Sequence, residues 1–454
     1  MNIDTTPIPG LLVIHLDVHA DNRGWFKEAW QREKMVELGL PDFRPVQNNM
    51  SFNLVAGTTR GIHAEPWDKL VTSAHGRFFG VWVDLRDGPG FGTVFTTEFD
   101  HKTAIFVPYG VANAYQTLTV GASYSYLVND HWTPEKIPDY SYVNLADPSL
   151  AIDWPIPLTD AEISDKDRHH PNLDQAKRLP GAKRTLILGG NGQLGIALGA
   201  LYPDAHRIDI LDLNLTDPDQ VAAFPWRDFD PIINAAAWTN VDGAETPSGR
   251  RGAWKANATM PTTLARIALA GGQRLVHISS DYVFDGWESS WSETADFAPL
   301  SVYGASKAAG DLVVSLVPRH YLVRTSWVVG EGRNFISTMA DLADRGLSPQ
   351  VVCDQIGRLT HTANLAAAIK HLLDTNAPYG TYNCTDGGEP ISWVDVAKAV
   401  FVKQGRSAGD VTPVATEQYY AGKENIAPRP AHSVLDLTKL EATGYVIPTY
   451  PLGE

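Results

Sequence analysis

The chain has 454 residues, of which 44% are hydrophobic and 20% are charged, and this globular composition and length predict two or three domains. The formal net charge is −15 and neither half of the sequence is net positive, which excludes a basic nucleic-acid-binding protein. The sequence has no run of about eighteen apolar residues and no basic segment followed by an apolar one at its start, so we expect neither a membrane span nor a secretion signal. It has only two cysteines, so we expect no disulfide scaffold and a cytoplasmic location.

The N-terminal part, residues 1 to about 160, has the pattern of β-structure. The stretches 71–86 and 102–110 are β-rich runs with turn residues between them, and 121–130 alternates small or polar residues with Tyr, Leu and Val. Short strands at close spacing are typical of a β-sandwich or a β-barrel. We therefore expect an all-β domain over residues 1–170.

A polar segment with two prolines follows, and it predicts a linker over residues 171–183. From residue 184 onward, apolar runs of strand length alternate with segments of helical spacing. This alternation predicts a doubly wound parallel sheet with helices on its faces over residues 184–454. No internal repeat is visible, so the sequence predicts a fusion of two unlike domains.

A G-x-x-G-x-x-G spacing occupies residues 189–195, directly after a predicted strand and at the start of a predicted helix. Glycines let the backbone approach a pyrophosphate, and the amides of the helix N-terminus attract its charge, so this loop predicts a dinucleotide site. Asp209 and Asp212 lie where a carboxylate can hold a ribose hydroxyl, although both positions also suit a loop or a cap. Arg207 would instead favour a 2′-phosphate, so the choice between NADH and NADPH stays open.

Tyr303 and Lys307 are four residues apart in a predicted helix, which puts both side chains on one face. A lysine ammonium stabilises a nearby phenolate, so this tyrosine can protonate a carbonyl oxygen while hydride reaches the carbonyl carbon. Upstream, a predicted strand ends in Ser279 and Ser280, whose hydroxyls can orient the same carbonyl group. Together with the glycine-rich loop, these residues predict a nicotinamide-dependent ketone reductase.

Residues 184–450 resemble dTDP-4-dehydrorhamnose reductase, an extended short-chain dehydrogenase. The stretches that carry the resemblance are GGNGQLG (189–195), INAAAWTNVDGAE (233–245), HISSDYVFDG (277–286), YGASK (303–307), RTSWVVG (324–330), NFISTM (334–339), VVCDQIGRLT (351–360) and RPAHSVLD (429–436). The resemblance implies a Rossmann-type domain with a small substrate-binding subdomain, which reduces the C4 ketone of a dTDP-sugar with NADPH or NADH. Reductases of this family can also hold Mg²⁺ at a subunit contact, and the sequence does not place its ligands.

The same resemblance assigns roles to single residues. Tyr303 would donate the proton, Lys307 would assist it, and Ser280 would orient the carbonyl group. Besides Tyr303 and Lys307, the cofactor-binding positions would be Gly189, Gly192, Gln193, Leu194, Gly195, Asp212, Ala236, Ala237 and Trp238. The residues that face the substrate would be Trp327, Asn334 and Arg429. The family usually has Thr at position 280 and Tyr at position 238.

In the N-terminal half, His63 follows a likely strand, and a lone histidine is more often structural than catalytic. A metal-binding cupin would need neighbouring histidine ligands in an H-x-H arrangement together with a carboxylate. The motif His63-Ala-Glu65 lacks the second histidine. We therefore expect no metal site in this half.

Residues 20–167 resemble dTDP-4-dehydrorhamnose 3,5-epimerase, a family of metal-free, cupin-like jelly rolls. The stretches that carry the resemblance are DNRGWFKE (21–28), VQNNMS (46–51), TRGIHAEPWDKLV (59–71), VDLRDGPGFG (83–92), FVPYGVANAY (106–115), YLVNDHW (126–132), ADPSLAIDWP (146–155) and ISDKD (163–167). The resemblance implies that His63 removes protons from the carbons that flank a C4 ketone, that Asp167 raises its basicity, and that Tyr126 delivers a proton from the opposite face. Such protons are weakly acidic, so their removal needs a base and cations near the developing enolate.

The substrate-binding positions that the second resemblance implies are Arg23, Glu28, Gln47, Asn49, Arg60, Lys69 and Asn113. Asn113 stands where the family has a histidine, which leaves the extent of epimerisation at the two carbons open. Epimerases of this family are dimers, so the resemblance also implies a homodimer.

The leading interpretation is a bifunctional enzyme of dTDP-L-rhamnose biosynthesis. Its first half would convert dTDP-4-dehydro-6-deoxy-glucose to dTDP-4-dehydro-rhamnose, and its second half would reduce the ketone. Two alternatives stay open at this point. The product could be a 6-deoxy-talose derivative, because a planar ketone can meet hydride on either face. The first half could also be a non-catalytic module that only binds the sugar nucleotide.

Overall fold

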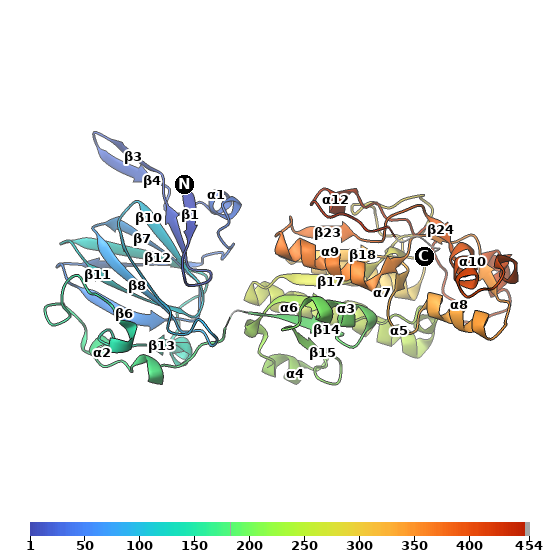
Figure 1. Ribbon diagram of the computed structural model, residues 1–454, viewed down its shortest axis with the longest axis horizontal. Helices are drawn as coiled ribbons and strands as arrows, with labels where there is room; N and C mark the ends of the chain where they lie inside the picture. Colours follow the sequence, from blue (N-terminus) through green and yellow to red (C-terminus); the bar gives the residue numbers. More distant parts are fainter. Residues whose placement is uncertain (182, 450–454) are drawn as a thin grey trace. The chain divides into compact units, whose positions relative to one another are not determined.

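A computed structural model describes residues 1–181 and 183–449 of the chain, in two compact units, Met1–Ala182 and Lys183–Glu454 (Figure 1). Most of the segment that we predicted as a linker belongs to the first unit. Its residues Leu173–Gln175 form a 3-10 helix, and Leu179 is buried and forms a β-bridge with Arg86. Among the described residues, no helix has the length and apolar character needed to cross a membrane.

The first unit is built from two antiparallel sheets. One sheet has the strand order β1 (Asn2–Thr5), β2 (Leu12–His15), β10 (Thr103–Val107), β7 (Lys69–His75), β12 (Ala122–Val128) and β5 (Gln47–Asn53). The other has the order β13 (Ser141–Tyr142), β6 (Thr59–Ala64), β11 (Val111–Thr117), β8 (Phe78–Asp84) and β9 (Val94–Phe99). A separate hairpin and two short helices complete the unit: β3 (Val18–Asp21), β4 (Gly24–Lys27), α1 (Arg32–Glu37) and α2 (Asp165–Arg168).

The two sheets enclose a core of large apolar and aromatic side chains. Val71 and Ile105 from one sheet share a buried cluster with Phe78 and Trp82 from the other. Because successive side chains of a strand point to opposite faces, the spacing of Tyr124 and Tyr126 puts both rings on the same face of β12. Both rings pack with this buried cluster. This face of β12 is therefore the one that points into the space between the two sheets.

The second unit is built around a six-stranded parallel sheet. Its strand order is β15 (His206–Ile208), β14 (Arg184–Leu188), β16 (Phe229–Asn234), β17 (Leu275–Ser280), β18 (His320–Thr325) and β23 (Gly380–Asn383). The main helices around it are α3 (Gln193–Leu201), α4 (Pro218–Ala223), α5 (Pro247–Trp254), α6 (Met260–Gly271), α7 (Val302–Val314) and α9 (Thr362–Asp374). This arrangement confirms the predicted parallel sheet.

Both faces of this sheet are covered by helices, and alternate residues of β14 show it. Ile187 packs in a cluster with residues of α3 and α9, whereas Leu186 and Leu188 pack in another cluster with residues of α6 and α7. The chain reverses its direction of growth at β14, because β15 lies on one side of that strand and β16 on the other. Ligands of such sheets bind outside the carboxyl ends of the strands at this point, where residues 189–195 lie.

The C-terminal part of the second unit has a smaller hydrophobic cluster of its own. It joins α8 (Phe335–Asp344) and α10 (Trp393–Lys403), which lie side by side in Figure 1, to β20 (Gln350–Val352). The remaining short elements are β19 (Val328–Val329), β21 (Ile356–Gly357), β22 (Thr360–His361), β24 (Ile391–Ser392), β25 (Thr412–Val414), α11 (Thr416–Tyr420) and α12 (Thr438–Glu441).

Two candidate active sites

The first unit contains a cavity of about 300 Å³. It is lined by Ser51, Arg60, Gly61, His63, Glu65, Lys69, Asn113, Tyr115, Tyr124, Tyr126, Ser164 and Asp167. His63 comes from β6 in one sheet and Tyr126 from β12 in the other. The structure thus brings the predicted base and the predicted acid into the same cavity from different sheets.

Asp167 holds the imidazole of His63 by a hydrogen bond of 2.9 Å between Oδ1 and Nε2. Burial alone would raise the pKa of Asp167, but the hydrogen bond and charge of His63 and the backbone N–H of Gly61 hold it below the ordinary value. An ionised carboxylate can only accept, so Nε2 of His63 carries the hydrogen and Nδ1 has the free lone pair. The pair therefore leaves Nδ1 as the basic atom.

Local structure explains why these two residues meet. Ser164 caps α2 by accepting from the N–H of Asp167 at 3.1 Å, which fixes the carboxylate at the first turn of the helix. Gly61, the neighbour of Asp167 on β6, has φ +122° and leaves no space for a side chain, because a Cβ there would collide with Ala114. A glycine at this position lets the backbone N–H of β6 approach the carboxylate.

Tyr126 has the properties of a proton donor. Burial raises the pKa of its phenol, and a hydrogen bond with Asn49 opposes this shift only in part. Asn49 is itself held by Gln47, whose Nε2 donates to Oδ1 of Asn49 at 2.9 Å. The phenol is therefore protonated at neutral pH, and two of the predicted substrate-binding residues position it.

The cationic part of the cavity is centred on Lys69, which is 4% exposed. Its Nζ donates to Oδ1 of Asn113 at 2.6 Å and forms an ion pair with Glu65. Burial lowers the pKa of Lys69 to about 7. Arg60 lines the same cavity and donates from Nε to Asn53 at 3.3 Å. Asn113, where the resembled family has a histidine, thus accepts a hydrogen bond from the buried lysine.

Arg23 and Glu28 do not join this cavity. Arg23 lies at the tip of the β3–β4 hairpin, exposed, in an ion pair with Asp21 at 2.5 Å. Glu28 is also exposed and pairs with Lys34 at 2.6 Å. The hairpin pairs with neither large sheet, which explains why these two residues are separated from the rest of the predicted set.

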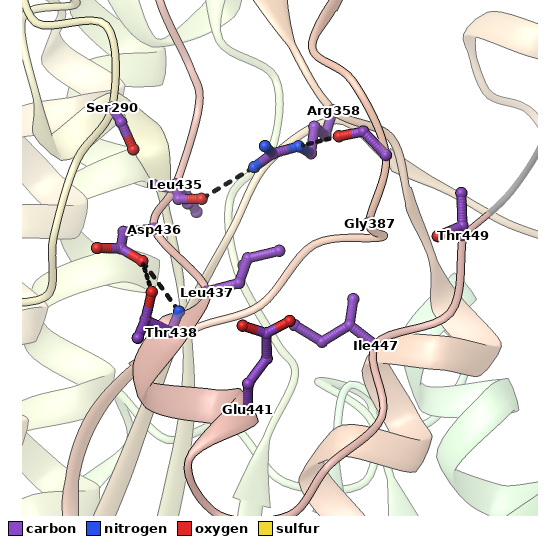
Figure 2. A pocket seen from close by; sticks show the side chains of 11 residues that line it. Ser290, Arg358, Gly387, Leu435, Asp436, Leu437, Thr438, Glu441, Ile447 and Thr449 are labelled. Carbon is purple, nitrogen blue, oxygen red and sulfur yellow. Dashed lines mark hydrogen bonds between the residues drawn. The ribbon is translucent and has the colours of Figure 1, made fainter.

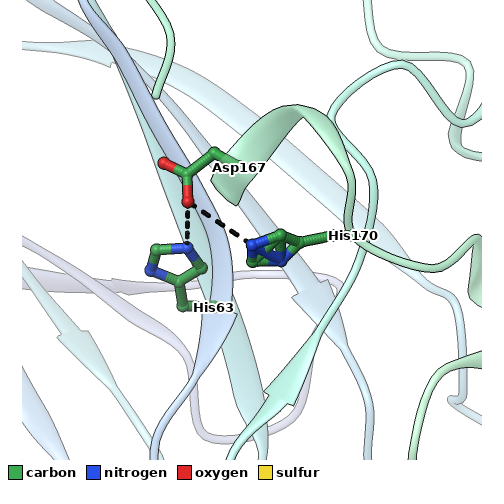
Figure 3. Close-up of side chains that lie close together, drawn as sticks. All are labelled: His63, Asp167 and His170. Carbon is green, nitrogen blue, oxygen red and sulfur yellow. Dashed lines mark hydrogen bonds and ion pairs between the residues drawn. The ribbon is translucent and has the colours of Figure 1, made fainter. Parts of the chain in front are cut away.

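Sequence reasoning missed several residues of the first site. Tyr115 and Tyr124 line the cavity as a stacked pair, with ring centroids 4.2 Å apart. His170 lies beside Asp167 and stacks on His63, with ring centroids 5.2 Å apart (Figure 3). The alternation of residues 122–128 was a usable signal for Tyr124, whereas the segment of His170 had the composition of a linker.

In the second unit, the glycine-rich loop connects β14 to α3, and Gly192 is the N-cap of the helix. Gly189 has φ +75°, and a Cβ there would lie 2.7 Å from the backbone nitrogen of Ala236. A Cβ on Gly195 would collide with the carbonyl oxygen of Gly189. The loop therefore packs against the predicted cofactor-binding segment at Ala236, and its glycines, with Gly192 as the N-cap, let the backbone at the helix N-terminus approach a pyrophosphate.

Two other residues of the loop segment have structural contacts. Leu194 is buried in the core cluster of the sheet, so its side chain cannot line a cofactor site, and only its backbone remains available. Gln193 donates from Nε2 to the carbonyl oxygen of Arg333 at 2.9 Å. This contact joins the start of α3 to the segment that precedes α8.

Of the two candidate aspartates, Asp209 is the one in contact with the loop. Its Oδ2 accepts from the backbone N–H of Asn191 at 3.3 Å. Asp212 instead accepts from the backbone N–H of Asp209 at 2.8 Å, which is a turn-capping contact. Arg207 lies with its guanidinium near Gly199 of α3. Asp209, which follows β15 directly, therefore borders the pyrophosphate loop, and Asp212 does not.

Tyr303, Lys307 and Ser280 meet at the start of α7. Burial raises the pKa of Tyr303 to about 12, and a hydrogen bond with Ser280 opposes this shift. Burial lowers the pKa of Lys307 to about 8, and the charge of Asp311 opposes it. Nζ of Lys307 donates to the carbonyl oxygen of Ile278 at 2.5 Å. These contacts give a protonated phenol with a buried cation one helical turn away.

A missed residue, Asn257, ties the cofactor segment to this helix. It accepts from the backbone N–H of Trp238 at 2.9 Å and donates to Oγ of Ser306 at 3.0 Å. Trp238 packs in the same cluster as Tyr303. Ala237 lies one residue before Trp238 and is exposed. The predicted cofactor segment therefore contacts the predicted proton donor.

The predicted substrate-facing residues have other partners in this structure. Trp327 stacks on Trp393 with ring centroids 3.8 Å apart. Asn334 is the N-cap of α8 and donates to the carbonyl oxygen of Gly330 at 2.6 Å, which makes its side chain structural. Arg429 forms two hydrogen bonds of 2.9 Å to the carboxylate of Asp242. A substrate would have to compete with Asp242 for this guanidinium.

A second cavity, of about 380 Å³, lies elsewhere in the second unit (Figure 2). Its lining includes Arg358, Asp436 and Glu441, and none of the predicted site residues. Arg358 donates to the carbonyl oxygens of Gly388 and Leu435, at 2.8 and 3.1 Å. Asp436 and Glu441 place two carboxylates in the same lining, which makes the cavity a poor match for an anionic substrate.

Comparisons with known proteins divide the chain at the same place. Residues 183–452 match the family described as RmlD substrate binding domain, and residues 5–175 match the family described as dTDP-4-dehydrorhamnose 3,5-epimerase. The "Protein RmlC homolog" of Streptococcus pyogenes serotype M6 is 50% identical over 177 residues, which are 38% of this chain and 89% of that protein.

The second unit is similar to reductases. A dTDP-4-dehydrorhamnose reductase of Aggregatibacter actinomycetemcomitans is 38% identical over 275 residues, which are 57% of this chain and 92% of that protein. The crystal structure of dTDP-4-dehydrorhamnose reductase from Bacillus anthracis in complex with NADP superimposes with a TM-score of 0.54 at 35% identity, covering 59% of this chain and 95% of that one.

Proposed function

Since the chain belongs to the RmlD substrate binding domain family, and its first half to the dTDP-4-dehydrorhamnose 3,5-epimerase family, we propose that it is a bifunctional enzyme of dTDP-L-rhamnose biosynthesis. The first unit epimerises dTDP-4-dehydro-6-deoxy-glucose at C3 and C5. The second unit then reduces the C4 ketone of dTDP-4-dehydro-rhamnose. The observation that carries the first activity is the placement of His63 and Tyr126 in one cavity, on different sheets.

In the proposed epimerisation, Nδ1 of His63 removes a proton from the carbon next to the ketone. Asp167 holds the imidazole in the required tautomer and stabilises its positive charge after proton transfer. Lys69 and Arg60 offset the negative charge that develops on the ketone oxygen. Tyr126 returns a proton from the other side of the sugar ring, which inverts the carbon.

In the proposed reduction, a nicotinamide held by the loop at 189–195 would be the source of the hydride that reaches C4. Tyr303 donates its phenolic proton to the ketone oxygen. Ser280, which is hydrogen-bonded to Tyr303, orients that oxygen. The ammonium of Lys307 stabilises the phenolate that remains. Epimerisation of a keto sugar is nearly neutral in free energy, whereas reduction by NAD(P)H is downhill. The reduction therefore draws the two reactions toward the product.

The residues of the second unit fit a dinucleotide. The loop at 189–195 has no space for a Cβ at Gly189 or Gly195 and leads into the N-terminus of α3. We assign Asp209, which contacts the loop, to the adenosine ribose. A carboxylate at this position suits the ribose hydroxyls of NADH, whereas Arg207 favours the 2′-phosphate of NADPH, so the pair of residues admits both cofactors. No described residue is assigned to the Mg²⁺ that the resemblance allowed, and no step depends on it.

The proposal extends to the fold of the first unit and to the oligomeric state of the protein. The two antiparallel sheets of the first unit are assigned to a cupin-like jelly roll. The functional form is a homodimer, in which the β3–β4 hairpin, with Trp25 41% and Phe26 67% exposed, is covered by a second copy. A size measurement by light scattering tests the second point, and a monomer at micromolar concentration would contradict it.

One experiment tests the whole proposal. The protein is incubated in heavy water with dTDP-4-dehydro-6-deoxy-glucose and either NADPH or NADH, and the products are identified by NMR. We expect dTDP-L-rhamnose with deuterium at C3 and C5. An axial C4 hydroxyl would instead identify a 6-deoxy-talose product. A reduced product without deuterium would mean that the first unit only binds the sugar nucleotide.

A further inference from the structure

A second histidine lies next to the proposed base and its carboxylate. Nε2 of His170 is 3.5 Å from Oδ1 of Asp167, the same oxygen that contacts Nε2 of His63 (Figure 3). His170 is only 8% exposed, and among the described residues neither of its ring nitrogens has a hydrogen-bond partner. Buried polar groups normally make hydrogen bonds, so a buried imidazole that makes none and lies 3.5 Å from a carboxylate oxygen indicates a ligand.

We propose that His63, Asp167 and His170 form a binding site for a divalent transition-metal ion of the Zn²⁺ type. Each residue offers one ligand atom, and these atoms lie within 4.8 Å of one another. Tetrahedral Zn²⁺, with bonds of about 2.0 to 2.1 Å, separates its ligand atoms by roughly 3.3 Å, so small side-chain shifts suffice. Two imidazoles and one carboxylate suit Zn²⁺, whereas Mg²⁺ and Ca²⁺ prefer oxygen ligands alone.

Surrounding contacts fix the chain segment that carries Asp167 and His170. The carbonyl oxygen of His170 accepts from Nδ2 of Asn144 at 3.1 Å, and its ring packs edge-on against Tyr142 with centroids 4.7 Å apart. Asp167 and His170 are three residues apart at the end of α2, and the Ser164 cap fixes that helix. Because the segment is fixed, rotation of the stacked imidazole rings is the rearrangement that directs their nitrogens at one ion.

The inferred ion inhibits the epimerase, and this part rests on the proposed function. To bind a metal through Nε2, the neutral imidazole of His63 must carry its hydrogen on Nδ1. Nδ1 is the atom that removes the substrate proton in the proposed mechanism, and it then has no lone pair. The ion also displaces the hydrogen bond between His63 and Asp167. Metal binding and proton removal therefore exclude each other.

The binding test uses Co²⁺, whose visible absorption reports tetrahedral coordination, on the metal-free full-length protein. We expect one equivalent to bind to the wild type, and Zn²⁺ but not Mg²⁺ to displace it. His170→Phe keeps the ring packing and breaks no hydrogen bond, and it weakens binding at least tenfold. The matched control, His169→Phe at the exposed neighbour, leaves binding unchanged. No tetrahedral spectrum in the wild type, or equal binding in both variants, would overturn the site.

X-ray absorption at the zinc edge gives a second test that needs no variant. The wild type should show nitrogen and oxygen neighbours with the scattering of imidazole rings. Sulfur neighbours would place the ion at a cysteine instead and would refute the site.

The inhibition test measures deuterium incorporation into dTDP-4-dehydro-6-deoxy-glucose. Saturating Zn²⁺ should suppress incorporation by at least tenfold in the wild type and in His169→Phe, a chelator should restore it, and His170→Phe should resist. Unchanged incorporation with the ion bound would refute the inhibition. A different outcome is that the protein binds Co²⁺ in the first test but incorporates no deuterium when it is free of metal. That outcome would refute the epimerase function and leave the metal site standing.

Discussion

Lys69 donates from Nζ to Oδ1 of Asn113 at 2.6 Å inside the cavity of the first unit. The asparagine stands where the resembled epimerases have a histidine, and it orients the one cation that is buried in this cavity's lining. A neutral amide can accept this hydrogen bond whatever the pH, whereas an imidazole would lose its acceptor when protonated. The departure from the family pattern thus keeps Lys69 positioned near the expected enolate oxygen.

Replacement of this cation should slow proton exchange. Lys69→Met keeps the length of the side chain and removes the charge that stabilises the enolate. We expect deuterium incorporation at C3 and C5 to fall by about 10²-fold or more, the range seen when one electrostatic stabiliser is removed. Lys102→Met, at an exposed lysine of the same unit, is the matched control. Wild-type exchange in Lys69→Met would remove Lys69 from the mechanism.

The two faces of the epimerase site should separate in Tyr126→Phe. His63 can still remove a proton and return a deuteron from its own side, but the opposite side has lost its donor. We expect deuterium to enter with retained configuration while the inverted product falls by about 10²-fold or more. NMR of the sugar protons distinguishes the two outcomes. Normal inversion would show that another group delivers the proton.

Removal of the carboxylate should act through the tautomer of His63. Asp167→Asn can present an amide N–H to Nε2, which then keeps its lone pair while the hydrogen moves to Nδ1. We expect exchange at both carbons to fall by about 10²- to 10⁴-fold, as when a histidine is held in the wrong tautomer, with little change in dTDP binding. Exchange above a tenth of the wild-type rate would contradict the assigned role.

Much of this could be predicted from the sequence because the signals are local. The glycine spacing at 189–195, the Tyr303 and Lys307 pair and the alternating strands and helices all follow from short stretches of chain. The pairing order of the first unit could not be predicted, since antiparallel partners such as β7 and β10 are far apart in sequence. The family resemblance, and not the local pattern, identified His63 and Tyr126.

The difference at the predicted linker has a physical cause. The prolines and charges of residues 171–183 suggested a linker, but Leu179 is buried and pairs with Arg86, so most of the segment belongs to the first unit. Leu194 and Asn334 stay predictions from the family positions, and the structure adds that the side chain of Leu194 packs in the core and that Asn334 caps a helix. A motif match places a residue near a site, and only the fold decides where its side chain points.

The reductase should lose activity as pH rises. Burial lowers the pKa of Lys307 to about 8, so its ammonium is present below this pH and is lost above it. We expect the rate of NAD(P)H oxidation to decline through about pH 8. The charge of Asp311 holds this pKa up, so Asp311→Asn should move the decline to lower pH. A pH profile with identical alkaline limbs in both proteins would contradict this electrostatic coupling.

The two activities should separate in Gly195→Val. A side chain at this position collides with the carbonyl oxygen of Gly189 and prevents the loop from approaching a pyrophosphate. We expect NADPH binding, measured by fluorescence, to weaken by at least about tenfold, and reduction to fall with it.

The first unit has its own core and its own cavity, so deuterium incorporation at C3 and C5 should remain at the wild-type rate. Tyr303→Phe, in contrast, should bind NADPH normally and still lose reduction by about 10²-fold or more, because it removes only the proton donor. If Gly195→Val bound NADPH as well as the wild type, the loop at 189–195 could not be the pyrophosphate site; if it lost exchange as well as reduction while remaining folded, the two units could not be working as independent catalysts.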